Sequence, residues 1–140
     1  MSTVYDCQIV FLHKVRSDRG NIVIVQGQED IPFDIKRIYF INEVPPNEIR
    51  GVHAHKNLRQ LILATKGTFT LILDDGVDKR NIKLSTEGYQ WGILIEKGIW
   101  RELEDFSEDA VCLVLASEDY NKEDYIYDYN EFLTYKRNGL

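Results

Sequence analysis

Short apolar runs separated by turn-forming residues are the feature of this sequence that most restricts its fold. Residues that tight turns favour recur at Asp18-Arg-Gly20, Pro45-Pro-Asn47, Lys66-Gly67, Asp74-Asp-Gly76 and Lys97-Gly98. Between these turns, runs of strand length are rich in β-branched and aromatic residues. We expect strands at Cys7–Val15, Asn21–Gln26, Ile35–Ile41, Gln60–Ala64, Thr68–Leu73, Asn81–Leu84, Gly92–Ile95, Ile99–Leu103 and Val111–Ala116. Many short strands with frequent turns predict an all-β sandwich or barrel.

Two segments carry more specific structural signals. The segment Leu61–Leu73 is predicted to form a hairpin whose turn lies at Lys66-Gly67. Both of its arms are largely apolar, which indicates strands that are covered on both faces, as in a two-layer jelly roll. Near the end of the chain, Asp128 and Glu131 have the spacing of a capping box. This spacing predicts a short C-terminal helix with Asp128 as its N-cap, ending at about Lys136.

Composition excludes several classes of protein. The chain has 140 residues without a linker or internal repeat, so we expect one domain over residues 1–140. The net charge is −6 and no long basic run is present, which argues against a nucleic-acid partner. No apolar run approaches membrane-spanning length and the start does not resemble a signal peptide, so we expect a cytoplasmic protein without a membrane partner. Cys7 and Cys112 do not form a CxxC motif and are expected to be reduced, buried thiols.

The segment Arg50-Gly-Val-His-Ala-His-Lys56 holds the most informative side chains. His53 and His55 are two residues apart, and on a strand this spacing points both imidazoles to the same face, roughly 7 Å apart. Two histidines that converge inside a small β-barrel could serve either metal binding or proton transfer. The residues around them decide between these two uses.

The spacing of these residues resembles the cupin signature. In cupins, HxH is followed after four further positions by an acidic residue and after six more by a glycine. Here Gln60 and Gly67 occupy those two positions. The second cupin motif ends in PxG, two residues and a histidine, where this chain has Glu96-Lys-Gly98 and then Arg101. Because two separated motifs agree in order, the resemblance implies a cupin jelly-roll barrel with a short C-terminal helix.

The departures from the cupin pattern favour proton chemistry. By the resemblance, metal-binding cupins use three histidines and a glutamate, whereas this chain has Gln60 for the acid and Arg101 for the third histidine. A guanidinium offers no lone pair and would repel a divalent cation. We therefore predict neither a metal nor another cofactor. Without a metal, His53 and His55 can remove and return a proton beside a carbonyl, while Arg101 stabilises an enediolate electrostatically.

At finer grain the sequence resembles the nucleotide-sugar 3,4-ketoisomerases of the cupin superfamily. The resemblance spans nearly the whole chain and is carried by Asp18-Arg-Gly20, Pro32–Phe40, Arg50–Lys56, Trp100-Arg-Glu102, Val114–Ser117, Asp124-Tyr-Ile126 and Tyr129–Phe132. It implies an isomerase that converts dTDP-4-oxo-6-deoxy-D-glucose to a dTDP-3-oxo-6-deoxy-hexose of galacto or gluco configuration. It also implies a role in making 3-amino-3,6-dideoxy sugars for surface polysaccharides such as the O-antigen of lipopolysaccharide. Thymidine rather than uridine is taken from the family alone.

The resemblance assigns roles to individual residues. His55 is expected to be the principal base, with His53 relaying protons. Tyr39 either offers a hydroxyl to the sugar or is a core tyrosine. Arg50 and Arg37 are candidates for the diphosphate, because a guanidinium donates two parallel hydrogen bonds to phosphate.

Three further positions complete the predicted site. Gln60 is expected to line the substrate pocket, since it occupies a ligand position of the cupin motif. Arg19 and Arg101 occupy positions that vary in the family and border the sugar. They could therefore bias the face on which C4 is protonated, and the sequence leaves the product configuration open.

Other functions and the assembly state stay open at this stage. A dTDP-sugar 3,5-epimerase is also a metal-free cupin and would use a histidine supported by an aspartate. A ligand-binding cupin without catalysis and a metal-dependent cupin oxygenase are further alternatives. Related cupins are homodimers, so we expect a homodimer in which the segment Cys7–Val15 could be exchanged between the two copies.

Overall fold

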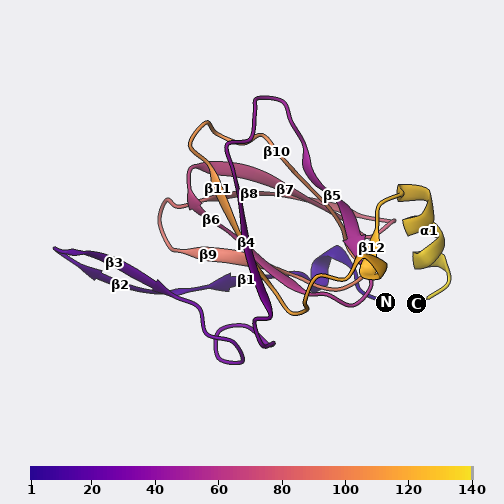
Figure 1. Ribbon diagram of the computed structural model, residues 1–140, viewed down its shortest axis with the longest axis horizontal. Helices are drawn as coiled ribbons and strands as arrows, with labels where there is room; N and C mark the ends of the chain where they lie inside the picture. Colours follow the sequence, from indigo (N-terminus) through magenta and orange to yellow (C-terminus); the bar gives the residue numbers. More distant parts are fainter. Residues whose placement is uncertain (140) are drawn as a thin grey trace.

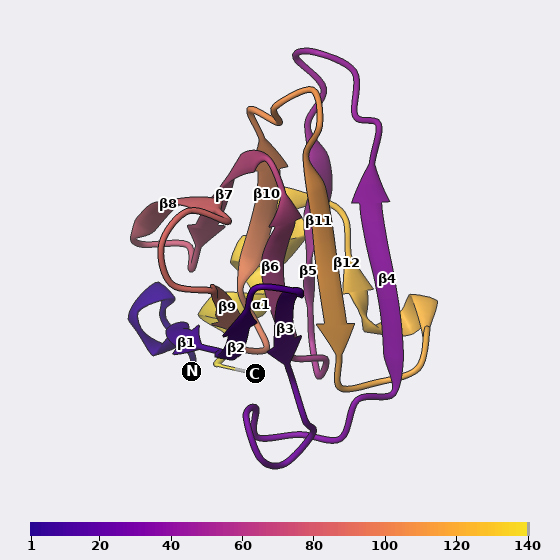
Figure 2. The same ribbon diagram turned by 90° about the vertical axis from the view of Figure 1, so that its left-hand side faces the viewer.

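Two five-stranded antiparallel sheets stack into a sandwich in the computed structural model, which describes residues 1–139. The first sheet has the order β1-β9-β6-β11-β4 and the second has the order β12-β5-β10-β7-β8 (Figures 1 and 2). The elements are η1 (Val4–Asp6), β1 (Gln8–Phe11), β2 (His13–Ser17), β3 (Gly20–Ile24), β4 (Arg37–Asn42), β5 (Arg50–His55), β6 (Gln60–Lys66), β7 (Thr68–Asp74), β8 (Lys79–Ser85), β9 (Trp91–Ile95), β10 (Trp100–Glu104), β11 (Val111–Ala116), η2 (Lys122–Asp124), β12 (Tyr125–Ile126) and α1 (Tyr129–Arg137). The predicted all-β jelly roll with a short C-terminal helix is confirmed.

The predicted strand Cys7–Val15 is divided in two by Leu12. Strand β1 pairs with β9 of the first sheet, whereas β2 pairs only with β3. The backbone N–H of Leu12 leaves the ladder and donates to the carbonyl of Gln90 at 2.9 Å, while the Leu12 side chain is buried. Beyond this point β2 and β3 form a two-stranded arm that projects from the sandwich, opposite α1 (Figure 1).

The predicted hairpin over Leu61–Leu73 is wrong, because β6 and β7 belong to different sheets. The chain crosses from one sheet to the other at Gly67, whose φ of +67° is a conformation that glycine adopts without strain. A Cβ atom at this position would lie 2.7 Å from the Cα of Ala110, so the crossing also requires a residue without a side chain. Strand β6 is apolar on both faces, but pairing with β7 is not the reason. One face meets the second sheet and the other is covered by residues 25–35.

Helix α1 supports the histidine strand from outside the sandwich. The carboxylate of Asp128 accepts a hydrogen bond from the N–H of Glu131 at 2.9 Å, which confirms the predicted N-cap. Phe132 of α1 is fully buried in a cluster with Ala54 and Trp100. Since Ala54 lies between the two histidines on β5, its burial under α1 fixes the strand whose other face carries them.

Within residues 1–139, no helix combines the length and the apolar character needed to cross a membrane.

Candidate active site

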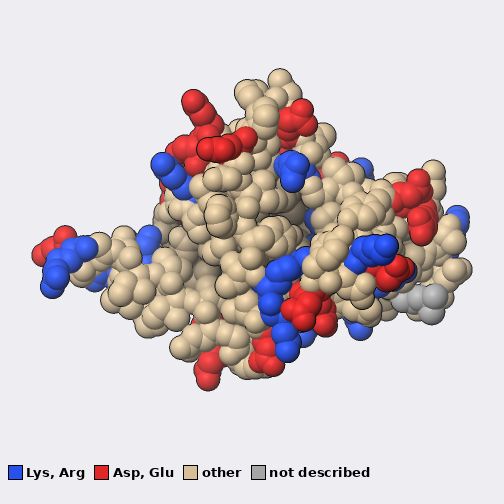
Figure 3. Space-filling model, viewed as in Figure 1, with Lys and Arg blue, Asp and Glu red and all other residues tan. Residues whose placement is uncertain are grey.

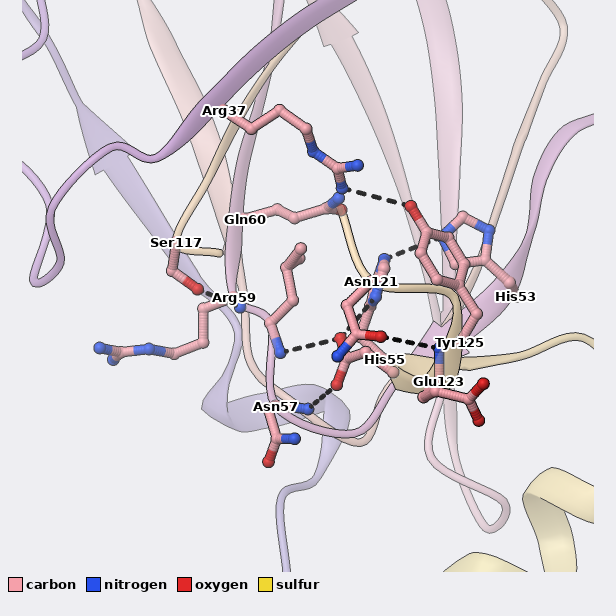
Figure 4. A network of polar contacts seen from close by, with 12 residues as sticks. Arg37, His53, His55, Asn57, Arg59, Gln60, Ser117, Asn121, Glu123 and Tyr125 are labelled. Atoms are coloured by element: carbon pink, nitrogen blue, oxygen red, sulfur yellow. Dashed lines mark hydrogen bonds and ion pairs between the residues drawn. The ribbon is translucent and has the colours of Figure 1, made fainter. Parts of the chain in front are cut away.

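The two histidines of β5 lie side by side on the inner face of the second sheet. His53 pairs directly with Arg101 of β10, so the two side chains share that face. The Nε2 atoms of His53 and His55 are 3.0 Å apart, and the rings meet edge to face with centroids 4.7 Å apart (Figure 4). His55 is fully buried and His53 is half-buried. The structure thus has the same-face arrangement that strand spacing predicts.

Asp124 lies directly behind His55 and was not among the predicted site residues. Its Oδ2 is 3.0 Å from His55 Nδ1, in a position set by the pairing of the next residue, Tyr125, with His55 across β12 and β5. The same carboxylate accepts hydrogen bonds from the backbone N–H groups of Asn57 at 2.7 Å and Leu58 at 3.3 Å. The only sequence signal for this residue was its place in the segment Asp124-Tyr-Ile126, which carries part of the family resemblance.

A second chain of hydrogen bonds runs from Arg101 to Tyr39. Arg101 is 1% exposed; its Nη1 donates to Gln60 Oε1 at 2.5 Å, and its Nη2 donates to the carbonyl of Ile99 at 2.8 Å. The amide nitrogen of Gln60 in turn donates to the hydroxyl oxygen of Tyr39 at 3.0 Å. Since Tyr39 receives this bond through its oxygen, its own O–H is free to donate elsewhere. Arg101 is therefore buried behind Gln60, with Gln60 between it and the Tyr39 hydroxyl.

These residues do not fit the metal centre of a cupin. Among the described residues 1–139, no group of three or more His, Cys, Asp or Glu side chains is placed to hold a metal ion. Arg101 stands where metal-binding cupins have their third histidine, and its guanidinium is bonded to the amide that replaces their acid. A fixed positive charge beside His53 and His55 opposes a cation in the same cavity.

Burial and the positive charge of Arg101 keep the histidines neutral at neutral pH. Burial, reinforced by Arg101 and Arg37, lowers the pKa of His53 to about 3. The same causes, burial first, lower the pKa of His55 well below its ordinary value. Burial also lowers the pKa of Arg101 to about 10, which leaves it charged, and raises the pKa of Tyr39, which leaves its O–H in place. The site therefore holds two neutral imidazoles beside the charged guanidinium of Arg101 and the protonated hydroxyl of Tyr39.

Arg37 and Tyr125 meet across the open edge between the two sheets. Arg37 lies at the start of β4, an edge strand of the first sheet, and its Nη2 donates to the Tyr125 hydroxyl at 3.2 Å (Figure 4). The guanidinium also lies over the rings of Tyr39 and Tyr120, 5.4 Å and 5.6 Å from their centroids. Arg37 Nε is buried without a hydrogen-bond partner. Figure 3 shows a hollow between β4 and β5, with Lys and Arg side chains around it.

Arg50 lies at the start of β5, at the edge of the sheet face that carries the two histidines. Arg50 pairs with Leu103, while His53 pairs with Arg101, so β5 contains one extra residue between the two pairs. Gly51 accommodates this bulge with a φ of +69°. The bulge places exposed Arg50 on the face of Leu103, beside the residues that follow β4.

Arg19 is the one predicted site residue that lies far from the histidines within this chain. It occupies the two-residue turn between β2 and β3, at the tip of the projecting arm (Figure 1). The other predicted residues lie on the inner face of the sandwich or at its open edge. They are His53, His55, Arg37, Tyr39, Arg50, Gln60 and Arg101.

The fold and the site together define a class: a jelly-roll protein with two histidines in contact, beside a buried arginine, where metal-binding cupins have their metal ligands. Comparison with known proteins narrows the class. The model of the FdtA family, described as WxcM-like, C-terminal, matches residues 5–137. A curated relative from Aneurinibacillus thermoaerophilus, TDP-4-oxo-6-deoxy-alpha-D-glucose-3,4-oxoisomerase, is 38% identical over 128 residues, or 91% of each chain. The chain belongs to the FdtA family and is an isomerase of the 3,4-ketoisomerase type.

Solved structures agree with this placement. QdtA, a sugar 3,4-ketoisomerase from Thermoanaerobacterium thermosaccharolyticum solved in complex with TDP, superposes with a TM-score of 0.93 at 33% identity over 99% of both chains. A histidine-to-asparagine mutant of the same enzyme was solved with TDP-4-keto-6-deoxyglucose. The WlaRB TDP-quinovose 3,4-ketoisomerase from Campylobacter jejuni is 40% identical, with a TM-score of 0.87 over 94% of this chain and 99% of that one.

Proposed function

We propose that the chain converts dTDP-4-oxo-6-deoxy-D-glucose to a dTDP-3-oxo-6-deoxy-hexose by acid–base catalysis through an enediolate. The observation that carries the proposal is the pair of neutral histidines beside a buried cation, at the open edge of the sandwich. The substrate is taken from the relatives, since one is named for TDP-4-oxo-6-deoxy-glucose and the mutant of QdtA was solved with that sugar nucleotide.

The proposed reaction moves one proton between adjacent carbons. The C4 ketone acidifies the C3 proton, which the histidine pair removes, and the electrons of the C–H bond form the enediolate. Return of a proton to C4 and transfer of the O3 hydroxyl proton to O4 leave the ketone at C3. His55, with His53 as its relay, supplies the base and then the acid.

Tyr39 is the proposed donor to the developing oxyanion. Its hydroxyl oxygen accepts from Gln60, and Gln60 accepts from Arg101. The positive charge of Arg101 polarises both hydrogen bonds and so makes the Tyr39 O–H a stronger donor. A charged group fixed behind the cavity stabilises negative charge on the enediolate without having to move during the reaction.

The diphosphate of the nucleotide is proposed to bind at Arg37 and Arg50. Arg37 has a buried Nε without a partner and faces the open edge, while Arg50 is exposed at the rim. A guanidinium suits phosphate because its N–H groups match the spacing of phosphate oxygens. We expect Arg37→Ala and Arg50→Ala each to raise KM more than they lower kcat.

The test is proton NMR in deuterated water with dTDP-4-oxo-6-deoxy-D-glucose and enzyme treated with a chelator. The expected result is deuterium at C4 together with a new C3 ketone. The coupling constants at C4 then identify the product as galacto or gluco, which is where Arg19 and Arg101 are proposed to act. An unchanged spectrum with active control enzyme present would overturn the proposed reaction.

The alternatives give different results in the same tube. Deuterium at C5 with the ketone still at C4 would indicate a 3,5-epimerase. The aspartate-supported histidine expected of such an enzyme is present here as Asp124 and His55, so that feature does not separate the two functions. Saturable binding without any exchange would indicate a ligand-binding protein, and turnover restored only by a transition metal would indicate a metal-dependent enzyme.

A homodimer with exchanged arms is the proposed assembly. The arm β2–β3 exposes Val15, Ile22 and Val23, and the outer face of the first sheet exposes Ile38 and Phe40. Apolar patches of this kind are typical of protein interfaces. Light scattering at micromolar concentration should give twice the chain mass. Ile22→Asp should give the monomer mass, whereas Val77→Asp, at a position that is 90% exposed and lies beside α1, should leave the dimer intact.

The exchanged arm would also explain how Arg19 could reach a sugar. In such a dimer, the tip of the arm lies on the second copy, so Arg19 would serve the partner's cavity rather than its own. Arg19→Ala should then alter the C4 configuration or KM in the dimer. In a mixed dimer of Arg19→Ala and inactive His55→Asn, one site combines an intact His55 with an intact Arg19 from the other copy. That site should show the wild-type C4 configuration and KM, which a role of Arg19 within its own chain would not allow.

The chemistry of the product suggests its use. A ketone at C3 is the acceptor that an aminotransferase converts to an amine, as required for 3-amino-3,6-dideoxy sugars of surface polysaccharides. We propose a cytoplasmic location, where nucleotide sugars are made. Turnover in a coupled assay with a sugar aminotransferase and an amino donor would support this use of the product. Failure of the product to be aminated would contradict it.

A further inference from the structure

The contact between the two histidines requires a definite arrangement of protons. Their Nε2 atoms are 3.0 Å apart, and a neutral imidazole carries one N–H and one lone pair. One histidine must therefore have its proton on Nε2 and donate it, while the other must have its proton on Nδ1 and accept. The contact alone allows either direction.

Asp124 removes that ambiguity. Its Oδ2 lies 3.0 Å from His55 Nδ1, and a carboxylate only accepts, so the proton of His55 lies on Nδ1. The lone pair of His55 is then on Nε2, and His53 donates its Nε2 proton to it. The hydrogen bonds run in one direction, from His53 to His55 to Asp124.

The carboxylate itself is held in place by the backbone. Asp124 Oδ1 accepts from the N–H of Asn57 at 2.7 Å and Oδ2 accepts from the N–H of Leu58 at 3.3 Å. The main chain of Asp124 also accepts from the N–H of Lys56 at 2.9 Å. These donors come from the turn that directly follows β5, so the carboxylate keeps a constant position relative to both histidines.

The surrounding charges make the position of the carboxylate important for the reaction. Positive or hydroxyl groups face the histidines from β10 and β4 (Arg101, Arg37 and Tyr39) and from β12 (Tyr125). Arg101 and Arg37 disfavour an imidazolium anywhere in the cavity. A carboxylate in contact with Nδ1 acts in the opposite direction, and only at His55. A proton taken from substrate is therefore best accommodated on His55.

We propose that Asp124 is a positioning residue that fixes His55 in its Nδ1–H form and makes His55 Nε2 the atom on which the substrate proton is stored. This inference rests on the proposed ketoisomerase function. The C3–H bond breaks and its electrons enter the enediolate. The proton reaches His55 Nε2 either directly, in exchange for the hydrogen bond from His53, or through His53. When His53 takes the proton on Nδ1, it passes its own Nε2 proton to His55. Either route leaves one additional proton on His55 Nε2 and His53 neutral. The stored proton exchanges with solvent, and His55 Nε2 then returns a proton to C4.

The test is Asp124→Asn. The Asn57 N–H is 2.7 Å from Oδ1, whereas the Leu58 N–H is 3.3 Å from Oδ2. We therefore expect the carbonyl oxygen of the new amide at the Oδ1 position and its N–H₂ facing His55 Nδ1. That contact forces His55 into the Nε2–H form and reverses the relay. We expect kcat to fall about 10³-fold or more, as for the wrong tautomer in a hydrolytic triad, with KM changed less than about threefold. Nitrogen-15 NMR of labelled histidine should show the proton of His55 moving from Nδ1 to Nε2.

Two further variants separate positioning from support of the fold. Asp75 also accepts three backbone hydrogen bonds, from Val4, Val77 and Asp78, and contacts neither histidine. Asp75→Asn should therefore lower stability without changing the His55 tautomer or kcat. Asp124→Glu keeps an acceptor and should recover the Nδ1–H form and part of the rate.

The NMR signal keeps the inference independent of turnover. A wild-type protein with the His55 proton on Nε2 would overturn the inference, whatever its activity, and so would Asp124→Asn with an unchanged tautomer and full rate. A wild-type protein with the expected tautomer but no isomerisation would overturn only the proposed function. If Asp124→Asn does not fold, the wild-type tautomer and the Asp124→Glu rate still decide.

Discussion

The interior of the sandwich has two sides that differ in chemistry although the same two sheets enclose both. Toward β7, β8 and β9 the inward side chains are apolar and fully buried, among them Phe69, Leu71, Leu84, Ile93 and Ile95. Toward β4, β5 and β12 they are polar and hydrogen-bonded to one another, with Tyr39, Gln60, His53, His55 and Arg101. Strand β10 serves both sides, because Arg101 joins the polar group and Leu103 joins the apolar core.

The comparison shows how one fold separates stability from chemistry. On the apolar side each large side chain stabilises the fold by burial, worth about 1.5–3 kcal/mol for a leucine or phenylalanine. On the polar side burial alone would be unfavourable, and hydrogen bonds between the buried groups offset it. Substitutions on the polar side should therefore act mainly on rate, and those on the apolar side mainly on the free energy of unfolding.

The largest effect is expected for His55→Asn. Loss of the proposed proton acceptor should lower kcat by about 10³-fold or more, since a positioned acid–base group contributes about 10²–10⁴. Binding of dTDP should persist, and thermal unfolding should shift by only a few degrees. Steady-state kinetics and calorimetry would measure both properties. His13→Asn, on the exposed arm, is the control and should keep the wild-type rate. Equal losses in both variants would contradict the division into two sides.

Arg101→Leu should have the next largest effect on the rate. It removes the buried cation and leaves the carbonyl oxygen of Gln60 and that of Ile99 without their donor. We expect kcat/KM to fall about 10²-fold, the loss typical of one electrostatic donor in a catalytic site. Arg101→Lys keeps the charge but not the forked geometry, so its kcat/KM should lie between those of Arg101→Leu and the wild type.

The pH dependence of the same variant tests the electrostatic cause. In the wild type, the pKa of His53 is lowered to about 3, so the neutral base persists as the pH falls below 6.5 and kcat/KM should stay level to about pH 5. Without the positive charge of Arg101, the histidine pKa values rise, and protonation removes the base at higher pH. The acid limb of the kcat/KM profile should therefore lie at higher pH in Arg101→Leu than in the wild type. A wild-type acid limb near pH 6.5 that Arg101→Leu leaves in place would contradict this cause.

The sequence predicts the polar side better than the layout of the sheets. The local spacing of His53 and His55 specifies the face that they share, and the resemblance to the two cupin motifs adds Gln60 and Arg101. Asp124 is 69 residues from His55 in the chain, and only the pairing of β12 with β5 brings them together. Local patterns likewise describe β6 and β7 as strands but do not say that they enter different sheets. The break at Leu12 depends on a bond to Gln90, far along the chain.

Leu84→Ala tests the apolar side. Leu84 of β8 is 0% exposed and belongs to the apolar cluster far from the open edge. Its truncation should lower the free energy of unfolding by about 2–5 kcal/mol through lost burial and a residual cavity. Denaturant titration would measure this loss, and kcat at 25 °C should stay within about twofold of the wild type. A large loss of rate in protein that is still folded would mean that the two sides are coupled through β7 and β10.

The smallest effect is expected for Asp128→Ala, which loosens the outer support of the polar side. The Asp128 side chain satisfies the Glu131 N–H at the start of α1, and loss of such a cap is worth about 1 kcal/mol. Helix α1 buries Phe132 against Ala54, between the two histidines. If α1 only stabilises β5, the unfolding temperature should fall by a few degrees with kcat unchanged; Asn130→Ala, at an exposed position within α1, is the control. If kcat falls more than the lost stability explains, the geometry of the two histidines depends on the packing of α1 against the outer face of β5.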